Sequence, residues 1–416
     1  MKQHEKEHHK RIVVKYGGAT LADHERISKA ATAVAKEAKK GTQIAVIVSA
    51  MGKTTDQLLS AAKNASNGKV EKGELDEILA MGERTSIRIF AAALKAQGIE
   101  SRYFDPLNPD WPIITDNVFS DANPILDKCE ERIQQYVLPL VEKGFIPVIA
   151  GFVGRTPDER ITTLGRGGSD TTAFILAKAL GADELILVTD AEGIMSADPK
   201  IISKPERLPD IDVNTLVGLA DSGTKFIHRK ALRYKDSSVK VRVISHTHGD
   251  LNAKGTLIKG TLSTELDVAL ASQTPAISIT VVGHGISEKP ELIQELTETV
   301  KIHAHLLGLS LNYDSIILYA QENEDSKLLL EKIHEIILEH EETLAMSVRK
   351  QLAFLKVKGV GLEETPGLIG KVSETLSLNA INIFGLLTIT SSILVFVDWN
   401  EKEKALSLIK NALRGD

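Results

Sequence analysis

Residues 11–50 read RIVVKYGGATLADHERISKAATAVAKEAKKGTQIAVIVSA, and they set the pattern for the first half of the chain. Two short apolar runs, Ile12–Tyr16 and Gln43–Ser49, flank an amphipathic stretch, Ala22–Lys40, that has the length of a helix. Strands separated by helices of this length are typical of a mainly parallel sheet sandwiched between helices. This stretch therefore predicts an α/β fold.

The same alternation continues to the end of the run ELILVT at Thr189. It predicts these elements in chain order: helices Asp56–Ala65 and Leu75–Gln97, strand Ser101–Phe104, helix Pro124–Lys143, strand Ile146–Gly151, helix Asp170–Leu180 and strand Glu184–Thr189. Several of the predicted strands end in glycine or small polar residues, and ligands of open α/β sheets bind outside the carboxyl ends of the strands. We therefore expect a binding crevice at that edge of the sheet.

A second region begins after a change in composition. Residues 245–259 are polar and contain glycine, which is typical of a boundary between domains. Beyond them the order strand, helix, strand, helix occurs twice: Ala276–Val282, Lys289–Leu307, Asp314–Ala320 and Ser326–His340, then Gln351–Lys358, Gly367–Leu378, Ser392–Asp398 and Lys402–Leu413. The pattern predicts an internal repeat of about 75 residues, in which each copy is a small α+β unit.

These observations divide the chain into three parts. Residues 1–10 are a charged, His-rich arm that we expect to be disordered. Residues 11–260 are the predicted α/β domain. Residues 261–416 hold the two smaller units, at about 276–345 and 346–416.

Composition and charge exclude several functions. The 416 residues carry 50 Lys and Arg against 56 Asp and Glu, a net charge of -6, so no overall positive field attracts nucleic acid or an anionic membrane. The single cysteine, Cys129, excludes an internal disulfide framework and a zinc cluster built from paired cysteines, and it fits a reducing cytoplasm. No uncharged apolar run approaches the ~18 residues that span a bilayer. We expect a cytoplasmic protein without a nucleic-acid or membrane partner.

The first motif is KYGGATL, residues 15–21, between a predicted strand and a predicted helix. Gly17 and Gly18 would let the backbone approach a phosphate closely, and Lys15 supplies a positive charge. A purely structural glycine turn explains the same residues and is, for this motif alone, the simpler interpretation.

The second motif is TTLGRGGSDTTA, residues 162–173, which leads into a predicted helix. Ser169 or Asp170 could cap that helix, so a structural interpretation accounts for both. It does not account for Arg166 between two glycines, since a planar guanidinium beside free backbone N–H groups suits a carboxylate or a phosphate. The motif therefore favours an anion site.

The third motif is VTDAEGIMSADPK, residues 188–200, which follows a predicted strand. A series of turns would explain Gly193 and Pro199. Three acidic residues could instead order ribose hydroxyls or magnesium-bound water: Asp190, Glu192 and Asp198. The sequence leaves both interpretations open.

Taken together, five segments resemble aspartokinase, a family with the amino-acid kinase fold. They are Lys15–Leu21, SAMGKTTDQL (49–58), Met81–Glu83, GRGGSDTTA (165–173) and TDAEG with ADPK (189–200). The resemblance covers nearly the whole chain from Lys10. It implies that 11–260 is the catalytic domain and that 261–416 is a pair of ferredoxin-like ACT regulatory domains, interleaved because a strand at Leu266–Ala271 would join the sheet of the second unit.

The resemblance implies transfer of the γ-phosphoryl group of ATP, with Mg²⁺, to the side-chain carboxylate of L-aspartate. The product would be 4-phospho-L-aspartate, in the first step toward lysine, threonine and methionine. The implied catalytic residues are Lys15 and Asp170, and the implied aspartate-site residues are Ser49, Thr55, Glu83, Phe152, Arg166 and Ser169. The implied nucleotide-site residues are Gly17, Gly18, Thr189, Asp190, Met195, Asp198, Lys200 and Lys225, and no residue is assigned to a metal. Glu83 and Lys225 could also be solvated surface charges.

This sequence departs from the family pattern on the nucleotide side. Ala19 replaces a hydroxyl residue, Met195 replaces an aromatic residue near adenine, and Lys200 replaces an arginine. Methionine cannot stack as a ring does, and lysine cannot make a bidentate phosphate contact. We therefore expect altered nucleotide affinity or base selectivity with the substrate unchanged.

The ACT resemblance implies feedback inhibition by lysine or threonine and a homodimer or higher homo-oligomer. The second effector loop has the expected Pro366 and Gly367, but Glu291 stands in the first loop where the family often has glycine, and it could occlude an effector carboxylate. Modules that serve only dimerisation are the alternative.

Two other functions remain open for the whole chain. One is an amino-acid-sensing binding protein with weak kinase activity, which the three nucleotide-side departures suggest. The other is a kinase for a related amino acid such as glutamate or N-acetylglutamate, which the ACT pair and the SAMGKTTD segment disfavour.

Overall fold

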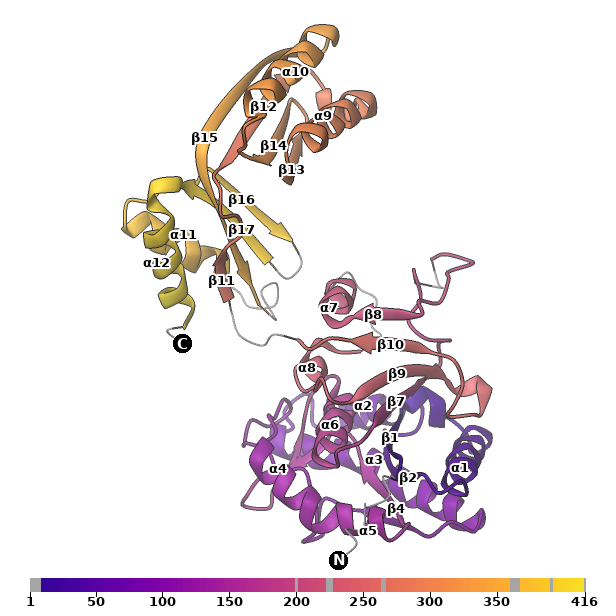
Figure 1. Cartoon of the computed structure of the whole chain (residues 1–416). Helices are drawn as coiled ribbons and strands as arrows, with labels where there is room; N and C mark the ends of the chain where they lie inside the picture. Colours follow the sequence, from indigo (N-terminus) through magenta and orange to yellow (C-terminus); the bar gives the residue numbers. More distant parts are fainter. Residues whose placement is uncertain are drawn as a thin grey trace, which may run out of the picture. The chain divides into compact units, whose positions relative to one another are not determined.

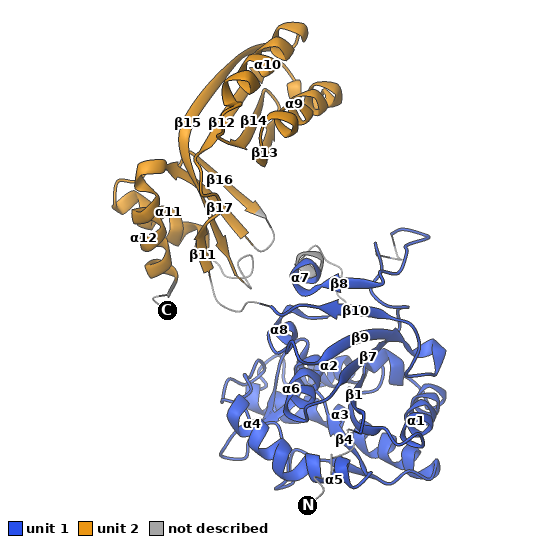
Figure 2. Ribbon diagram, in the orientation of Figure 1, with its two compact units in different colours: residues 1–262 blue, residues 263–416 orange. Residues whose placement is uncertain are grey.

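The computed structural model describes residues 9–198, 201–221, 227–262, 267–359, 367–389 and 392–414. The chain forms two compact units, Met1–Leu262 and Ser263–Asp416, coloured separately in Figure 2. No helix within the described ranges is both long enough and apolar enough to cross a membrane.

The first unit is built on an eight-stranded sheet with the order β3-β4-β2-β1-β7-β9-β10-β8 (Figure 1). Its strands are β1 (Arg11–Tyr16), β2 (Gln43–Val48), β3 (Ser101–Phe104), β4 (Ile146–Ala150), β7 (Glu184–Thr189), β8 (Asp210–Asp212), β9 (Lys240–Ser245) and β10 (Thr256–Lys259). The pairs are parallel except that of β10 with β9. The apolar run of β1 lies in the middle of the sheet with its valines fully buried, which explains why that run directs the fold.

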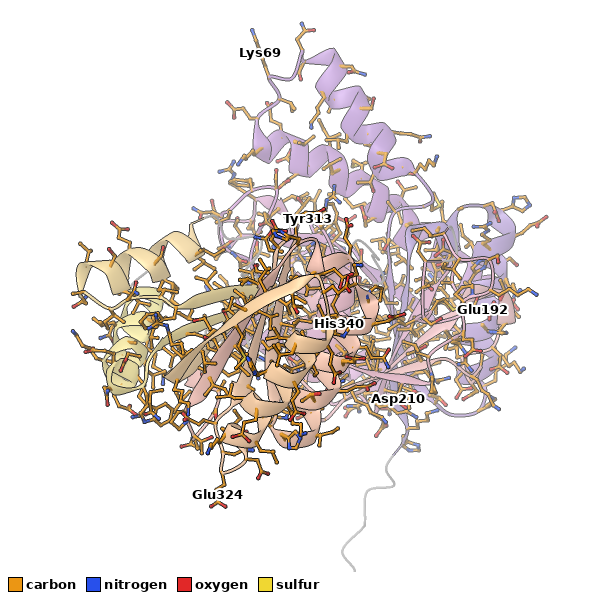
Figure 3. The ribbon with its side chains drawn as sticks, turned by 90° about the horizontal axis from the view of Figure 1, so that it is seen from above. Lys69, Glu192, Asp210, Tyr313, Glu324 and His340 are labelled. Atoms are coloured by element: carbon orange, nitrogen blue, oxygen red, sulfur yellow. The ribbon has the colours of Figure 1, made fainter. Side chains whose placement is uncertain are left out.

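Helices cover both faces of this sheet, as the alternation predicts. On one face α1 (His24–Ala38) packs against α3 (Lys72–Ala96), which also packs against α2 (Thr54–Ala65). On the other face α4 (Leu126–Arg132) packs against α6 (Gly168–Ala179). The turn between α2 and α3 carries Lys69, labelled in Figure 3, at the far end of a helical hairpin that projects from the sheet.

The predicted helix Pro124–Lys143 is interrupted. It consists of α4, a π-helical segment η2 (Ile133–Val137) and α5 (Leu138–Glu142). Pro139 lies in the first turn of α5. Because proline has no N–H to donate to the preceding turn, the regular hydrogen-bond ladder cannot run through it, and the wider π turn takes up the mismatch.

Five strands of the first unit were not predicted from the sequence. A hairpin of β5 (Val153–Arg155) and β6 (Ile161–Thr163) follows β4, and β8, β9 and β10 complete the sheet. The segment 245–259, expected to be a boundary, contains β10 within the first unit. β5, β6, β8 and β10 have only three or four residues and so show little periodicity, whereas β9 has six residues and was overlooked.

The second unit is one antiparallel sheet with the order β13-β14-β12-β15-β17-β16. Its strands are β11 (Asp267–Leu270), β12 (Ala276–Gly283), β13 (Leu306–Asn312), β14 (Ser315–Gln321), β15 (Thr343–Lys358), β16 (Gly385–Ile389) and β17 (Ser392–Asp398). Its helices are α9 (Pro290–His303), α10 (Ser326–Glu339), α11 (Leu368–Leu378) and α12 (Lys402–Arg414). They form two separate cores, α9 with α10 and α11 with α12 (Figure 1).

Strand β15 is twice as long as predicted. The sequence predicts a strand only at Gln351–Lys358, but the strand begins at Thr343. It pairs first with β12 and then with β17. Its last residues also pair with β11, which precedes β12 in sequence. Met346 and Val348 are half-buried and alternate with the exposed Ala345, Ser347 and Arg349, so the first half of the strand has the alternation of a strand that the prediction overlooked.

Candidate active site

The carboxyl ends of β1, β2 and β4 meet the first turn of α6 at one edge of the first sheet. Lys15, near the end of β1, places its Nζ 2.6 Å from Oδ1 of Asp170 in α6. Ser49, directly after β2, shares a hydrogen bond of 2.9 Å between its Oγ and that of Ser169. Three distant segments of the chain therefore form two adjacent contacts.

The start of α6 shows that neither Ser169 nor Asp170 caps the helix. The N-cap is Gly167, whose φ of 75° lies in the left-handed region, and no side chain caps the first turn. Both side chains are instead directed to the ends of other strands. The capping interpretation of the second motif is therefore wrong for these two residues.

The Lys15–Asp170 pair is shielded from solvent, since only 14% and 13% of the two side chains are exposed. The separation is that of a charge-assisted hydrogen bond. The carboxylate thus fixes the position of an ammonium group that solvent can still reach, which is the arrangement expected of a cation that meets an anionic ligand.

The two glycines after β1 have different roles. A Cβ on Gly18 would lie 2.7 Å from the carbonyl oxygen of Ala50, so close packing requires glycine there. A Cβ on Gly17 would meet nothing closer than 3.8 Å, and one of the nearest atoms is Nζ of Lys15. A structural turn therefore explains Gly18, but the missing side chain at Gly17 leaves space beside the Lys15 ammonium.

Glu83 is buried rather than solvated. It lies on α3 with 3% of its surface exposed, and its Oε1 accepts a hydrogen bond of 3.0 Å from the N–H of Ala50. Its Oε2 has no hydrogen-bond partner among the described residues. Burial raises the pKa of this carboxyl to about 7, and the Ala50 N–H partly offsets that rise. The unpaired oxygen is suited to bind a cationic group.

Asp76, two turns earlier on α3, was missed by sequence reasoning. It is fully buried and accepts four hydrogen bonds, from the N–H and hydroxyl of Ser120 and from the N–H and hydroxyl of Thr163, at 2.7–3.2 Å. It thereby fixes the end of β6, directly before the loop that carries Arg166. No sequence signal distinguishes it from an ordinary acidic helix residue.

Phe152 follows β4 with a φ of 66°, an unusual value for a bulky residue. Its carbonyl accepts a hydrogen bond of 2.8 Å from Leu164, and a Cβ on Gly168 would lie 3.0 Å from its Cα. The phenylalanine is thus packed against the loop that leads into α6. Such strained residues occur often at binding sites.

Two further predicted residues border this cluster. Arg166 is exposed and makes no hydrogen bond or ion pair with the residues that the structure describes, so its guanidinium is available to a ligand. Thr55 is half-buried in the first turn of α2, close in sequence to Ser49.

The nucleotide-side residues follow β7. The hydroxyl of Thr189 accepts from the N–H of Ala191, and Asp190 is exposed. Met195 forms a β-bridge with Arg207, and the carbonyl of Asp198 accepts from two backbone N–H groups. Lys200 and Lys225, like Pro199 and Pro366, lie outside the described residues.

Glu192, labelled in Figure 3, is already engaged. Its carboxylate accepts from the hydroxyl of Thr247 at 3.0 Å and lies 2.8 Å from Nε2 of His248. It therefore anchors the loop after β7 to the 3-10 turn η3 (His246–His248). Of the three acidic residues in the third motif, Asp190 and Glu192 are exposed and Asp198 is half-buried.

The contacts form a continuous series from Glu83 through Ala50, Ser49 and Ser169 to the Lys15–Asp170 pair. One end offers an unpaired carboxylate oxygen and the other a held ammonium, with Arg166 beside them. This set suits a small ligand that carries both charges, together with a phosphate near Lys15. The described residues contain no group of three or more His, Cys, Asp or Glu that could hold a metal ion.

Comparisons with known proteins show which family the chain resembles. The model of the amino acid kinase family matches residues 10–245. The chain is 32% identical to an aspartokinase of Thermus thermophilus, over 97% of this chain and 99% of that protein. It is 31% identical to aspartokinase 2 of Bacillus subtilis, over 96% of this chain and 97% of that protein.

Solved structures show the same fold. An aspartate kinase from Synechocystis matches with a TM-score of 0.74 at 24% identity, over 97% of this chain and 69% of that one. Aspartokinase III of E. coli, in complex with aspartate and ADP, matches with a TM-score of 0.56 at 21% identity, over 97% and 100% of the two chains. Another structure of that protein contains lysine and aspartate.

Proposed function

The chain belongs to the amino acid kinase family and, within it, to the aspartokinases, and from this premise we propose that it phosphorylates the side-chain carboxylate of L-aspartate with ATP. The observation that carries the residue assignment is the unpaired Oε2 of the buried Glu83, which is linked by adjacent contacts to the Lys15–Asp170 pair. A ligand with an ammonium at one end and a reacting carboxylate at the other fits that series.

Glu83 binds the ammonium group of aspartate. A buried carboxylate oxygen without a partner costs about 1–3 kcal/mol, and a bound ammonium removes that cost. The guanidinium of Arg166 binds the α-carboxylate, and the hydroxyls of Ser49 and Ser169 lie between these two charges. This arrangement leaves the side-chain carboxylate of the substrate directed toward Lys15.

The chemical step needs no protein nucleophile. An oxygen of the aspartate side chain, already ionised at neutral pH, attacks the γ-phosphorus of ATP, and the bond from that phosphorus to the β-γ bridging oxygen breaks. ADP leaves with the electron pair and 4-phospho-L-aspartate is formed, so no general base is required. Lys15, held by Asp170, neutralises charge on the transferring group, and Gly17 leaves the space for it.

The nucleotide lies along the loops after β1 and β7. We assign Gly17, Gly18, Thr189 and Asp190 to it together with the residues beyond them: Met195, Asp198, Lys200 and Lys225. Mg²⁺, when bound with ATP, neutralises charge on the β- and γ-phosphates. The exposed carboxylate of Asp190 is available toward that ion.

The second unit is assigned a regulatory role as a pair of ACT domains, with lysine or threonine as effector and a homodimer or higher homo-oligomer as the assembly. The lysine in a structure of E. coli aspartokinase III supports this assignment. Glu291 is exposed in the first turn of α9. Activity with and without lysine, threonine and methionine tests it, and no response to any of them favours modules that serve only dimerisation.

A weak kinase that senses amino acids is the second candidate, favoured by Ala19, Met195 and Lys200 on the nucleotide side. Purified protein with ATP, Mg²⁺ and hydroxylamine is tested with aspartate, glutamate and N-acetylglutamate. Aspartyl hydroxamate that forms in step with ADP supports the proposal. Turnover of another acid supports a kinase for a related amino acid, and turnover of none supports the amino-acid sensor. Either result would contradict a role in the first step toward lysine, threonine and methionine.

A further inference from the structure

Residues 193–198 and 201–208 form the two described arms of a hairpin that stands outside the main sheet and is called here the nucleotide hairpin. The arms are held together by hydrogen bonds of Leu208 N to Ile194 O at 2.8 Å and of Ser196 N to Glu206 O at 2.7 Å. It carries Met195 and Asp198, which the proposed function places at the nucleotide. No aspartate-site residue lies on it.

The buried hydroxyl of Thr256 is hydrogen-bonded to both arms of this hairpin at its base. Oγ1 of Thr256 accepts from the N–H of Ile194 at 3.0 Å and donates to the carbonyl of Leu208 at 2.6 Å. Thr256 is fully buried, and so is Ile194. Water therefore cannot replace the hydroxyl, and its loss would leave the Ile194 N–H without this partner.

Gly193 makes this contact possible. Its φ is 136°, and a Cβ built on it would lie 2.7 Å from Oγ1 of Thr256. Only glycine allows the hydroxyl to approach the hairpin backbone so closely. The glycine of the third motif thus has a function that a series of turns does not explain.

Thr256 itself is held rigidly. It lies on β10, opposite Val243 of the buried strand β9, and the following residue, Leu257, pairs with Asp210 of β8. A group on a strand that is paired on both sides is a more precise support than a group on a loop. The hairpin is therefore fixed to the sheet at its base through one side chain.

We propose that Thr256 is a positioning residue for the nucleotide: its hydroxyl holds the nucleotide hairpin in the orientation that binds ATP, without touching ATP. This inference rests on the proposed function, since it takes the hairpin to be the nucleotide side of the site. It predicts an effect on ATP that is separate from any effect on aspartate.

The test compares full-length Thr256→Val, Thr256→Ser and wild type. Valine keeps the branched shape and the strand preference but removes the hydroxyl, and serine restores it. We expect the KM for ATP to rise about tenfold in Thr256→Val, with the KM for aspartate within twofold of wild type, and to return to within about threefold in Thr256→Ser.

Thr343→Val is the matched control. Thr343 lies in the second unit, is 8% exposed, and donates its hydroxyl to the carbonyls of Ile337 and His340. The control loses a buried hydroxyl of the same kind, so we expect it to lower thermal stability and leave the KM for ATP unchanged. A similar rise of the KM for ATP in Thr256→Val and Thr343→Val would overturn the proposal.

Titration calorimetry with ATP and Mg²⁺ separates this proposal from the proposed function, because it needs no aspartate. A wild type that binds ATP but phosphorylates no aspartate refutes the function, and a weaker Kd in Thr256→Val still supports the positioning role. An unchanged Kd in folded Thr256→Val overturns it. If Thr256→Val does not fold, Gly193→Ala is measured instead. An unchanged Kd for ATP in Gly193→Ala would also overturn the positioning role.

Discussion

Replacing Glu83 by Gln changes one atom of the site and tests the proposed role of its carboxylate. The amide oxygen can keep the hydrogen bond from the N–H of Ala50. The amide NH₂ takes the place of the unpaired Oε2 and cannot accept a hydrogen bond from an ammonium. The variant therefore removes the proposed substrate contact and leaves the local fold in place.

The effect on substrate follows from the charge. A hydrogen bond to a charged group contributes about 1.5–3 kcal/mol, which corresponds to a KM for aspartate raised by roughly 10- to 100-fold. The KM for ATP should stay within about twofold, because Glu83 lies on α3, away from the loops assigned to the nucleotide.

Glu83→Gln should raise the free energy of unfolding, by an amount that depends on pH. Burial raises the pKa of Glu83 from 4.5 to about 7, so the folded protein favours the protonated carboxyl. The stabilising contribution of the protonated form is complete below pH 4.5 and is lost as the pH rises through 7, a change of about 3 kcal/mol. Because Gln does not titrate, Glu83→Gln should gain up to about 3 kcal/mol over wild type between pH 4 and pH 8.

The same ionisation controls catalysis in the wild type. The proposed ammonium contact needs the carboxylate, so kcat/KM for aspartate should fall about tenfold per pH unit below pH 7. In Glu83→Gln this dependence should disappear.

Steady-state kinetics at pH 6–9 and urea unfolding at pH 4–8 measure these quantities. A Glu83→Gln enzyme with wild-type KM for aspartate refutes the assignment of Glu83 to the substrate. If the difference in unfolding free energy between Glu83→Gln and wild type stays constant across that pH range, the proposed ionisation of Glu83 is refuted.

Four further substitutions follow from the structure. Lys15→Ala should lower kcat by about 10²–10³ and leave aspartate binding measurable by calorimetry, and an active variant would contradict the role of the Lys15–Asp170 pair. Asp76→Asn should destabilise the fold by roughly 2–4 kcal/mol in urea, since an amide cannot accept from four donors, and unchanged stability would show that the network is dispensable. Gly18→Ala should lower the melting temperature because its Cβ would meet a carbonyl at 2.7 Å, while Gly17→Ala should keep it and lose activity; equal behaviour of the two variants would contradict their separate roles.

Much of the first unit could be predicted because β1, β2, β4 and β7 are apolar runs of five or six residues. The βαβ pattern around β1 and β2 places Lys15 and Ser49 at the same edge of the sheet, and the glycine-rich loop before α6 brings Ser169 and Asp170 to them. These positions follow from strand ends, which a sequence shows plainly.

The residues that the sequence did not reveal act through tertiary contacts. Asp76 and Thr256 are single polar residues whose partners lie at least 44 and 48 positions away, so no local pattern marks them. The first half of strand β15 was overlooked although Met346 and Val348 alternate with exposed residues, because little of it is buried. The π-helical segment before Pro139 depends on how a proline is accommodated. Glu83 could be selected by resemblance, but its burial and its unpaired oxygen are visible only in the fold.

In the proposed reaction, the site directs the side-chain carboxylate of aspartate, rather than its α-carboxylate, toward the transferred phosphoryl group. Borohydride reduces an acyl phosphate to an alcohol, so treatment of the reaction mixture followed by amino-acid analysis identifies the carboxylate that reacted. We expect homoserine as the reduced product, in step with the ADP released. Formation of 3-amino-4-hydroxybutanoate, or of ADP without either alcohol, would contradict it.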